Sequence, residues 1–335
     1  MKSREVQLIS RPPSMPTPED FRVIETELGY PGPGEVLVRN LFMSVDPYMR
    51  GRMRDRKSYV PPFGLGETMT GGAVGEVVES QVPELLPGDY VLSNFGWREA
   101  FCCAAGEVTP LGTLGASPSA YLGVMGMPGM TAYTGLLGAA TLKDGETVFI
   151  TGAAGAVGTI AGQIAKIKGC RVVGTAGSAD KVRYIVDELG FDYAFNYRDG
   201  KLRESIRAGA PEGVDVFFDN VGGELLQAGI GAMREHGRIA LCGAISMYND
   251  TEPAPGPTNL ARMIGLGLNI RGFLVRHYSH MRADFMRDVG QWLADGRIIY
   301  RETVYEGIES APDAFIGLFT GANTGKMVVR LGGVD

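Results

Sequence analysis

The sequence predicts an α/β fold in which a doubly wound parallel sheet of the Rossmann type is joined to a second, antiparallel domain. One observation is a glycine-rich turn between an apolar run at 147–151 and a segment whose isoleucines recur at helical spacing. A second is the alternation of strand and helix patterns after this turn. A third is a series of short strand patterns before it. Alternating strands and helices are typical of a parallel sheet with helices on both faces.

The turn itself carries three glycines, Gly152, Gly155 and Gly158, at three-residue spacing. In a dinucleotide site such glycines allow a tight turn, a close approach to the pyrophosphate, and close packing of the helix on the strand. The helix N-terminus then attracts the phosphates. The spacing departs from G-x-G-x-x-G, so a glycine-rich corner that binds nothing stays an alternative.

The segments after this turn continue the alternation. Short runs rich in β-branched and aromatic residues predict strands, and wider apolar spacing predicts helices. We expect strands at 171–176, 193–197, 214–220, 238–243 and 270–275, and helices at 180–189 and 260–268.

The N-terminal third differs, because turn signals separate strand patterns with no long helical pattern until about residue 116. We expect strands at 5–10, 21–28, 35–46, 71–80 and 89–95, short helices at 117–126 and 130–140, and a tail with a strand at 302–305, a helix at 310–318 and a strand at 326–331. The predicted domains are a barrel-like one at 1–125 and 303–335, and the Rossmann domain at 126–302.

Composition narrows the class of protein. The chain has 335 residues, 44% hydrophobic and 21% charged, which is ordinary for a globular protein, and its net charge of −6 argues against nucleic-acid or anionic-membrane partners. Its four cysteines suggest no disulfide framework and favour a reducing, cytoplasmic location. The N-terminus lacks the apolar run of a secretory signal.

One stretch, 108–142, contains no charged residue. Its seven glycines and three prolines do not provide the ~20 continuous apolar helical residues that cross a bilayer. We therefore expect buried helices at a domain junction, and no membrane span.

Several segments, read in order, resemble the medium-chain dehydrogenase/reductase superfamily, and within it the zinc-free prostaglandin reductase and leukotriene B4 12-hydroxydehydrogenase branch, which includes curcumin reductase and plant double-bond reductases. The segments are SVDPYMR at 44–50, MPGMTAY at 127–133, AAGAVG at 153–158, GQIAKIK at 162–168, FNY at 195–197, FDNVGG at 218–223, GRIALCGAISMY at 237–248 and GANTGK at 321–326. The resemblance implies a GroES-like catalytic domain, a Rossmann domain and a homodimer joined through the strand at 270–275.

The end of the second strand bears on the cofactor. An NAD site usually has an acid there for the ribose 2′-hydroxyl, whereas this chain has Gly177 and Ser178, followed by Lys181. The absence of that acid and the presence of nearby cations favour binding of the 2′-phosphate of NADP. The resemblance implies that Lys181 and Tyr197 contact this phosphate. A solvated helix-start charge is the alternative for Lys181.

The resemblance implies further contacts along the cofactor. It places Asn220 near the nicotinamide half, although Asn220 can also cap the turn that follows it. Phe273, Leu274 and Val275 would be simple sheet core by composition alone. The full set expected to bind NADP(H) is Gly152, Ala154, Gly155, Ala156, Val157, Gly158, Gly177, Ser178, Lys181, Tyr197, Asn220, Cys242, Gly243, Ala244, Ile245, Tyr248, Phe273, Leu274, Val275 and Asn323.

Zinc is not expected. Zinc-dependent relatives supply an early cysteine and a Gly-His-Glu segment, where this chain has Ser44-Val45-Asp46 and 70–73 reads TGGA. All three histidines fall outside the barrel-like domain. His277 and His280 are spaced like ligands, but no suitable cysteine or carboxylate accompanies them, which favours a solvated loop.

Without a metal, the substrate's hydride acceptor must already be polarised, and a conjugated enone or enal meets this need. Hydride would add to the β-carbon, and donors would stabilise the enolate oxygen. The candidate donors are Tyr248, Tyr59 and Tyr48, of which Tyr48 is equally well explained by packing; Arg50 can pair with an acid instead of touching substrate. The leading hypothesis is NADPH-dependent reduction of a small unsaturated carbonyl compound. The alternatives are a quinone reductase and a non-catalytic NADPH-binding sensor or scaffold.

Overall fold

A computed structural model describes residues 1–332. Its contacts divide the chain into two units, which are described separately. One comprises Met1–Leu122, Glu302–Asn323 and the residues from Met327 onward, and the other comprises Gly123–Arg301 with Thr324–Lys326. The second unit therefore contains the glycine turn and a three-residue piece of the tail.

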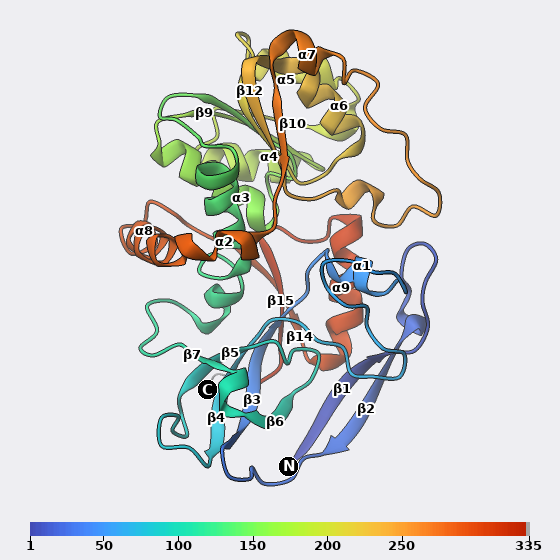
Figure 1. The fold of residues 1–335 in the computed structure, drawn as a ribbon, viewed down its shortest axis with the longest axis vertical. Coiled ribbons are helices and arrows are strands. Elements are labelled where there is room, and N and C mark those ends of the chain that lie inside the picture. The colour runs from blue at the N-terminus through green and yellow to red at the C-terminus, as the bar shows by residue number, and fades with distance from the viewer. Residues whose placement is uncertain (333–335) are drawn as a thin grey trace. The chain divides into compact units, whose positions relative to one another are not determined.

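The second unit is built on a six-stranded sheet with the order β10-β9-β8-β11-β12-β13, and every pair in it is parallel (Figure 1). The order reverses between β8 and β11, and the carboxyl ends of the strands at such a switch point form the usual ligand crevice of this fold. The predicted Rossmann sheet is confirmed. Its strands are β8 (Thr147–Ile150), β9 (Arg171–Ala176), β10 (Tyr193–Asn196), β11 (Val214–Asp219), β12 (Met233–Leu241) and β13 (Asn269–Gly272).

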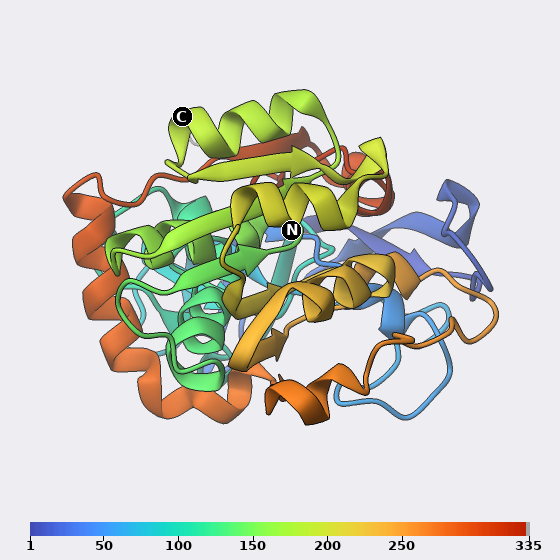
Figure 2. The ribbon, with the colours of Figure 1, turned by 90° about the horizontal axis from the view of Figure 1, so that it is seen from above.

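Helices join these strands. Right-handed crossovers on the two sides of the switch point place α3 and α4 on one face of the sheet and α5 and α6 on the other (Figure 2). A buried cluster that includes Phe149, Phe217 and Ile239 packs under the second face. The helices are α2 (Met127–Thr134), α3 (Ala156–Ile167), α4 (Ala179–Arg183), α5 (Leu202–Gly209), α6 (Gly223–Ala232), α7 (Arg262–Leu266) and α8 (Arg282–Ala294).

The first unit is mainly antiparallel. The strand β3 pairs with β4, β6 and β15, and β5 pairs with β4 and β7, all antiparallel, while β1 and β2 form a separate antiparallel pair. The elements are β1 (Lys2–Leu8), β2 (Phe21–Glu27), β3 (Glu35–Ser44), α1 (Met49–Arg52), β4 (Ala73–Ser80), β5 (Tyr90–Ser93), β6 (Ala100–Ala104), β7 (Thr109–Pro110), β14 (Glu302–Glu306), α9 (Ala311–Thr320) and β15 (Lys326–Arg330).

The core of this unit gathers around Trp97, which is fully buried. Its ring stacks on Phe21 at 6.1 Å between centroids and meets the edge of Phe315 at 6.1 Å. Buried methionines, including Met49 and Met53, belong to the same cluster. Because these two flank the turn of α1, the core fixes the segment that carries Tyr48.

Several predicted boundaries are wrong. The sixth strand was predicted at 270–275 but is Asn269–Gly272, because the chain turns into a 3₁₀ helix at Val275–Met281. The helix predicted at 117–126 is only a 3₁₀ turn at Pro118–Leu122, and the next one begins at Met127, where Pro128 suits a first turn. The strand β6 and the short helix α1 were missed, since neither has a periodic apolar pattern, and the helices α5, α6 and α8 were not predicted either.

No helix within residues 1–332 is long and apolar enough to cross a membrane. The uncharged stretch at 108–142 instead contains the 3₁₀ turn Pro118–Leu122, α2 and a π-helical turn at Gly135–Ala139.

Candidate functional site

The glycine turn connects β8 to α3, and its geometry requires glycine at two positions. Gly152 has a φ of +60°, which favours glycine. A Cβ added to Gly158 would lie 2.3 Å from the carbonyl oxygen of Gly152, so the helix can approach the turn only without a side chain. Gly155 is the N-cap of α3 and offers no capping side chain. The first turn of α3, which begins at Ala156 and Val157, therefore presents backbone N–H groups suited to a phosphate.

The tail reaches this turn. The Gly325 N–H donates to the carbonyl oxygen of Ala154 at 2.8 Å, and Gly155 and Gly325 form an isolated β-bridge. A Cβ on Gly325 would lie 1.9 Å from the carbonyl oxygen of Arg301, and its φ is +69°. The glycine of the GANTGK segment is thus required for the chain to lie against the turn, a role that the sequence pattern did not reveal. The preceding Asn323 belongs to the first unit.

Asn220 follows β11 and is held to β8. Its side-chain amide donates to the carbonyl oxygen of Thr151 at 2.7 Å, and its backbone N–H donates to the Thr151 hydroxyl at 2.9 Å. The Thr151 hydroxyl in turn donates to the carboxylate of Asp219 at 2.6 Å. Asp219 is fully buried, and burial raises the pKa of its carboxyl group. Sequence reasoning singled out Asn220 but missed both residues that orient it.

The segment after β12, from Cys242 to Tyr248, is hydrogen-bonded to the turn after β11. The N–H groups of Cys242 and Gly243 donate to the carbonyl oxygen of Asp219, and that of Ile245 donates to the carbonyl oxygen of Asn220. A Cβ on Gly243 would lie 3.0 Å from the Asn220 carbonyl oxygen. These two segments therefore form one rigid edge beside the switch point.

Tyr248 ends this segment. Its hydroxyl oxygen accepts a hydrogen bond from the N–H of Ala244 at 3.3 Å. Burial raises the pKa of the Tyr248 phenol, and the nearby Cys242 and Asp219 act in the same direction, so the phenol is protonated at neutral pH. In the contact with Ala244 the phenolic oxygen acts as the acceptor, through one of its lone pairs. Burial also raises the pKa of the Cys242 thiol to about 12, which argues against a thiolate there.

At the carboxyl end of β9, Gly177 and Ser178 precede α4. The Ser178 hydroxyl accepts from the Lys181 N–H at 3.4 Å, so Ser178 caps the helix. The ring of Tyr197 lies against Gly177, where a Cβ would meet Tyr197 Cε1 at 3.1 Å. Burial lowers the pKa of Lys181, and the charge of Arg198 lowers it further. Tyr197 thus lies against Gly177 as the predicted site requires, and Arg198 is a further cation near Lys181.

The segment Phe273–Val275 lies beyond β13 rather than within it. The Phe273 ring meets the Phe218 ring edge-on, with 6.1 Å between the centroids, and it meets the Tyr278 ring edge-on at the same separation. Phe273 is half-buried. Packing therefore accounts for Phe273 by itself, and Leu274 and Val275 lead into the 3₁₀ helix.

The two remaining tyrosines belong to the first unit. Tyr48 is half-buried against the core, and burial together with Asp46 raises the pKa of its phenol, while a hydrogen bond with Arg52 lowers it. Tyr59 is 49% exposed on the loop after α1.

Arg52 fixes that loop. Its Nε donates to the carbonyl oxygen of Pro61 at 2.9 Å, a terminal nitrogen donates to the Thr70 hydroxyl at 3.0 Å, and its guanidinium lies 3.9 Å from the centroid of the Phe63 ring. Arg50, also from α1, is fully buried and donates to the carbonyl oxygens of Pro12 and Ser14. Burial lowers the pKa of Arg50 to about 10. Arg50 therefore ties down the N-terminal loop through backbone carbonyls.

Where zinc-dependent relatives have an early cysteine, Ser44 donates its hydroxyl proton to the Asp46 carboxylate. Within residues 1–332, no three His, Cys, Asp or Glu side chains lie together in a way that would hold a metal ion.

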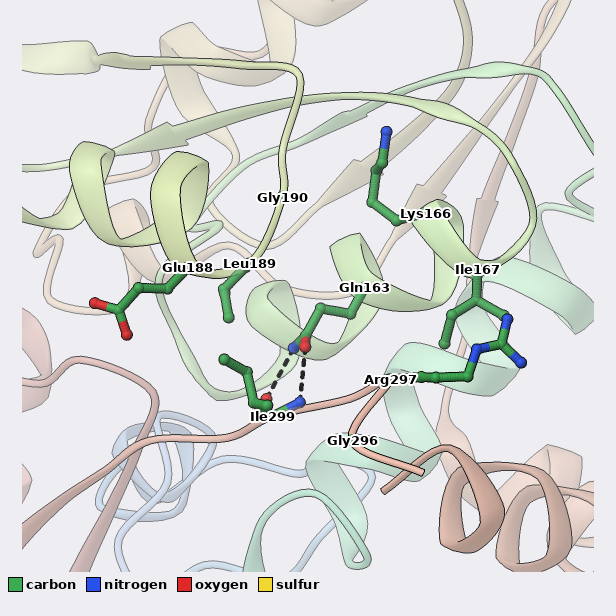
Figure 3. A pocket seen from close by; sticks show the side chains of 9 residues that line it. All are labelled: Gln163, Lys166, Ile167, Glu188, Leu189, Gly190, Gly296, Arg297 and Ile299. Atoms are coloured by element: carbon green, nitrogen blue, oxygen red, sulfur yellow. Dashed lines mark hydrogen bonds between the residues drawn. The ribbon is translucent and has the colours of Figure 1, made fainter. Parts of the chain in front are cut away.

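A cavity of about 400 Å³ lies beside the C-terminal end of α3, between Lys166, Leu189 and Arg297 (Figure 3). Two hydrogen bonds, at 2.8 and 2.9 Å, join the Gln163 amide to the backbone of Ile299, and both residues line the cavity. The 12 residues of α3 span about 18 Å, so this cavity is remote from the glycine turn.

The switch point, the glycine turn and the edge formed after β11 and β12 define a Rossmann-type oxidoreductase with a separate antiparallel domain. Residues 4–111 match a family profile described as the N-terminal domain of oxidoreductase, and residues 156–294 match one described as zinc-binding dehydrogenase.

Relatives match over the whole length. The chain is 42% identical to the NADPH-dependent curcumin reductase of Escherichia coli, over 100% of this chain and 98% of that protein. It is 43% identical to the NADP(+)-dependent 2-alkenal reductase of Nicotiana tabacum, over 90% and 88%. The crystal structure of CurA from Vibrio vulnificus in complex with NADPH superimposes with a TM-score of 0.94 at 42% identity, covering 98% of this chain and 99% of that one. The chain belongs to the medium-chain dehydrogenase/reductase family, in the branch of curcumin and 2-alkenal reductases.

Proposed function

We propose that this protein is an NADPH-dependent reductase of the C=C bond of α,β-unsaturated ketones and aldehydes. The observation that carries the proposal is the full-length similarity to curcumin and 2-alkenal reductases. Conjugated carbonyl compounds need no metal to polarise them, which agrees with the Ser44–Asp46 pair at the position of the early cysteine.

The residues of the second unit fit a dinucleotide phosphate. The glycine turn and the N-terminus of α3 suit a pyrophosphate, and Lys181 with Tyr197 suits a 2′-phosphate. Asn220, held by Thr151, suits the nicotinamide half. When bound, NADPH supplies the hydride that adds to the β-carbon.

Tyr248 is our first candidate for the group that stabilises the enolate oxygen. Two observations support it: its phenol keeps its proton at neutral pH, and its position after β12 is fixed by backbone hydrogen bonds. A donor held in place before reaction needs no reorganisation when charge develops on the substrate oxygen. Tyr59 and Tyr48 are the further candidates, and protonation of the α-carbon completes the reduction.

A substrate panel tests the function. Steady-state assays with NADPH, an aliphatic enone, an alkenal and a naphthoquinone should show the highest kcat/KM for the enone or alkenal. A higher value for the quinone would instead indicate a quinone reductase. Single-turnover oxidation of NADPH that never exceeds the rate without substrate would indicate a sensor or scaffold.

The proposal also covers the location of the protein and its oligomeric state. All four cysteines are free, which favours a reducing, cytoplasmic location. Within the described chain, β13 pairs with β12 alone and so leaves one edge of the sheet open. Open edges are usually covered or paired, so we propose a homodimer in which the β13 strands of two chains pair.

A further inference from the structure

The cavity of about 400 Å³ beside the C-terminal end of α3 is large enough for a small organic ligand, since ligand sites begin near 300 Å³. Its walls come from α3, from the π-helical turn at Tyr184–Glu188 with the residues after it, and from the chain at 296–299 that follows α8. Single π-helical turns are frequent at functional sites. The glycine turn lies at the opposite end of α3, so a ligand here would leave the cofactor residues free.

Three aliphatic side chains form part of the wall. Ile167 is half-buried, Leu189 is buried, and Ile299 is 42% exposed. At Gly190 and Gly296, which also line the cavity, an added Cβ would meet no atom within 4 Å, so the backbone leaves open space beside both. An aliphatic group that enters this space removes apolar surface from water, which favours binding in proportion to its length.

The position of Ile299 is fixed before any ligand binds. The Gln163 amide donates to the Ile299 carbonyl oxygen and accepts from its N–H, and it also donates to the carbonyl oxygen of Thr159 at 3.0 Å. Both N–H groups of the buried amide are thus used, and the chain at 299 is held against α3. A wall ordered in advance lowers the entropic cost of binding.

Two of the three charged side chains in the lining are already neutralised. Lys166 pairs with Asp192, and Glu188 pairs with Arg301, each at 2.9 Å. Both side chains point away from the centre of the cavity (Figure 3). The remaining charge is the guanidinium of Arg297.

Arg297 is exposed on the chain after α8, and within residues 1–332 its guanidinium forms no ion pair. Its side chain points toward Ile167 (Figure 3). The cavity thus combines one unneutralised cation with aliphatic walls. This combination is complementary to a molecule that has one negative charge and an apolar body.

We propose that this cavity binds a small carboxylate with an aliphatic chain, of the medium-chain fatty acid class. The carboxylate pairs with Arg297, whose planar guanidinium presents two donors that match the two carboxylate oxygens. The chain lies against Ile167, Leu189 and Ile299. This site depends on neither the proposed substrate nor the candidate donor tyrosines.

Calorimetry of the NADPH-saturated protein with octanoate tests the proposal. We expect a Kd on the order of 0.1–1 mM, the range for a ligand of about ten non-hydrogen atoms. From butanoate through hexanoate to octanoate, the Kd should fall about fourfold for each added CH₂ group. Arg297→Gln should raise the octanoate Kd by about 10-fold, the scale of one lost charge-assisted hydrogen bond. Arg203→Gln removes an equal charge from an exposed position on α5 and should leave the Kd unchanged.

A second variant and a second ligand separate charge from chain. Ile299→Glu places a negative charge on the wall and should abolish octanoate binding. Octan-1-ol, which has the same chain without the charge, should bind the wild type and Arg297→Gln equally.

Three outcomes would overturn the proposal. One is an octanoate Kd that Arg297→Gln or Ile299→Glu leaves unchanged, and another is a wild type that binds no octanoate below 10 mM. The third is octanoate that competes with NADPH or with an enone substrate, because this result would place the carboxylate in the reductase site. None of these outcomes bears on the proposed activity, which the substrate panel tests separately.

Discussion

The hydroxyl of Thr151 donates to the buried carboxylate of Asp219 at 2.6 Å and accepts the backbone N–H of Asn220 at 2.9 Å. One hydroxyl at the end of β8 thereby orders the residues that end β11. The carboxylate also accepts the N–H groups of Val221 and Gly222, at 3.1 Å each. The two strands that flank the switch point are joined at the place where a dinucleotide would cross them.

Thr151→Val should therefore weaken both stability and cofactor binding. It leaves the buried Asp219 carboxylate without one donor and the part-buried Asn220 N–H without its acceptor, which costs about 1–3 kcal/mol in free energy of unfolding. Thr175→Val is the matched control, because the Thr175 hydroxyl is buried on β9 and has no hydrogen-bond partner within residues 1–332. Urea unfolding in the absence of cofactor measures the free energy of unfolding of both variants. Equal midpoints for the two would contradict the prediction.

Tyr248→Phe should reduce kcat on an enone by about 10²–10³, the usual scale for one lost oxyanion donor. The Kd for NADPH should barely change, because the ring and its packing remain. In the wild type, kcat should not fall with rising pH until the pH passes the ordinary phenol pKa of about 10, since burial raises the pKa of the donor phenol. A near-normal kcat in the variant would remove Tyr248 as donor and direct attention to Tyr59.

Lys181→Ala should raise the Kd for NADPH by roughly 10- to 150-fold and leave the Kd for NADH little changed, because a charge-assisted contact of about 1.5–3 kcal/mol is lost. The wild type should also lose NADPH affinity at alkaline pH. Lys181 is neutral above its pKa, and burial with Arg198 lowers that pKa, so the loss begins below the ordinary value of 10.5.

The charged groups that bear on this pH dependence are Arg198 from the adjoining turn, and Asp180 and Arg183 on α4 itself, which pair with each other. Arg198→Gln should move the alkaline loss of affinity to higher pH, because one repelling charge is removed. NADPH affinity in the wild type that stays flat up to pH 11 would speak against a Lys181–phosphate contact.

Arg52→Gln should free the loop that carries Tyr59. The substitution removes the hydrogen bonds to Pro61 and Thr70 and the stacking on Phe63. We expect KM for a bulky enone to rise by about 10-fold while the NADPH Kd stays constant, since about 1–2 kcal/mol of loop ordering is lost. Arg56→Gln, on the exposed part of the same loop, is the control. Identical kinetics for the two variants would exclude a positioning role for Arg52.

Light scattering at micromolar concentration should give the mass of two chains of 35.8 kDa each. The expectation rests on the open edge of β13 and on Ile264 nearby in the sequence, which is 88% exposed. A charged residue in place of Ile270 on β13 should shift the mass toward one chain. A monomeric wild type would refute the dimer.

Local sequence patterns predicted the strands of the parallel sheet well, because periodicity and turn residues act over a few neighbouring positions, but they did not predict the helices α5, α6 and α8. They failed where tertiary context decides: the strand expected to run to Val275 ends at Gly272, and α1 and β6 lacked any periodic signal. The glycine turn was accessible to such reasoning for the same local reason, whereas Lys181, Tyr197 and the segment from Cys242 to Tyr248 were implied by the family resemblance and stay predictions.

The sequence by itself determined the alternation of strands and helices and the missing acid after β9, since both follow from residue types at neighbouring positions. Only the tertiary structure decided which distant residues complete each part of the site. Thr151 meets Asp219 because β8 and β11 are adjacent, and Arg198 approaches Lys181 because β9 pairs with β10 in one register. Gly325 lies on the turn through a contact about 170 positions away in the chain. Such pairings depend on strand order and register, which a short window of residues does not encode.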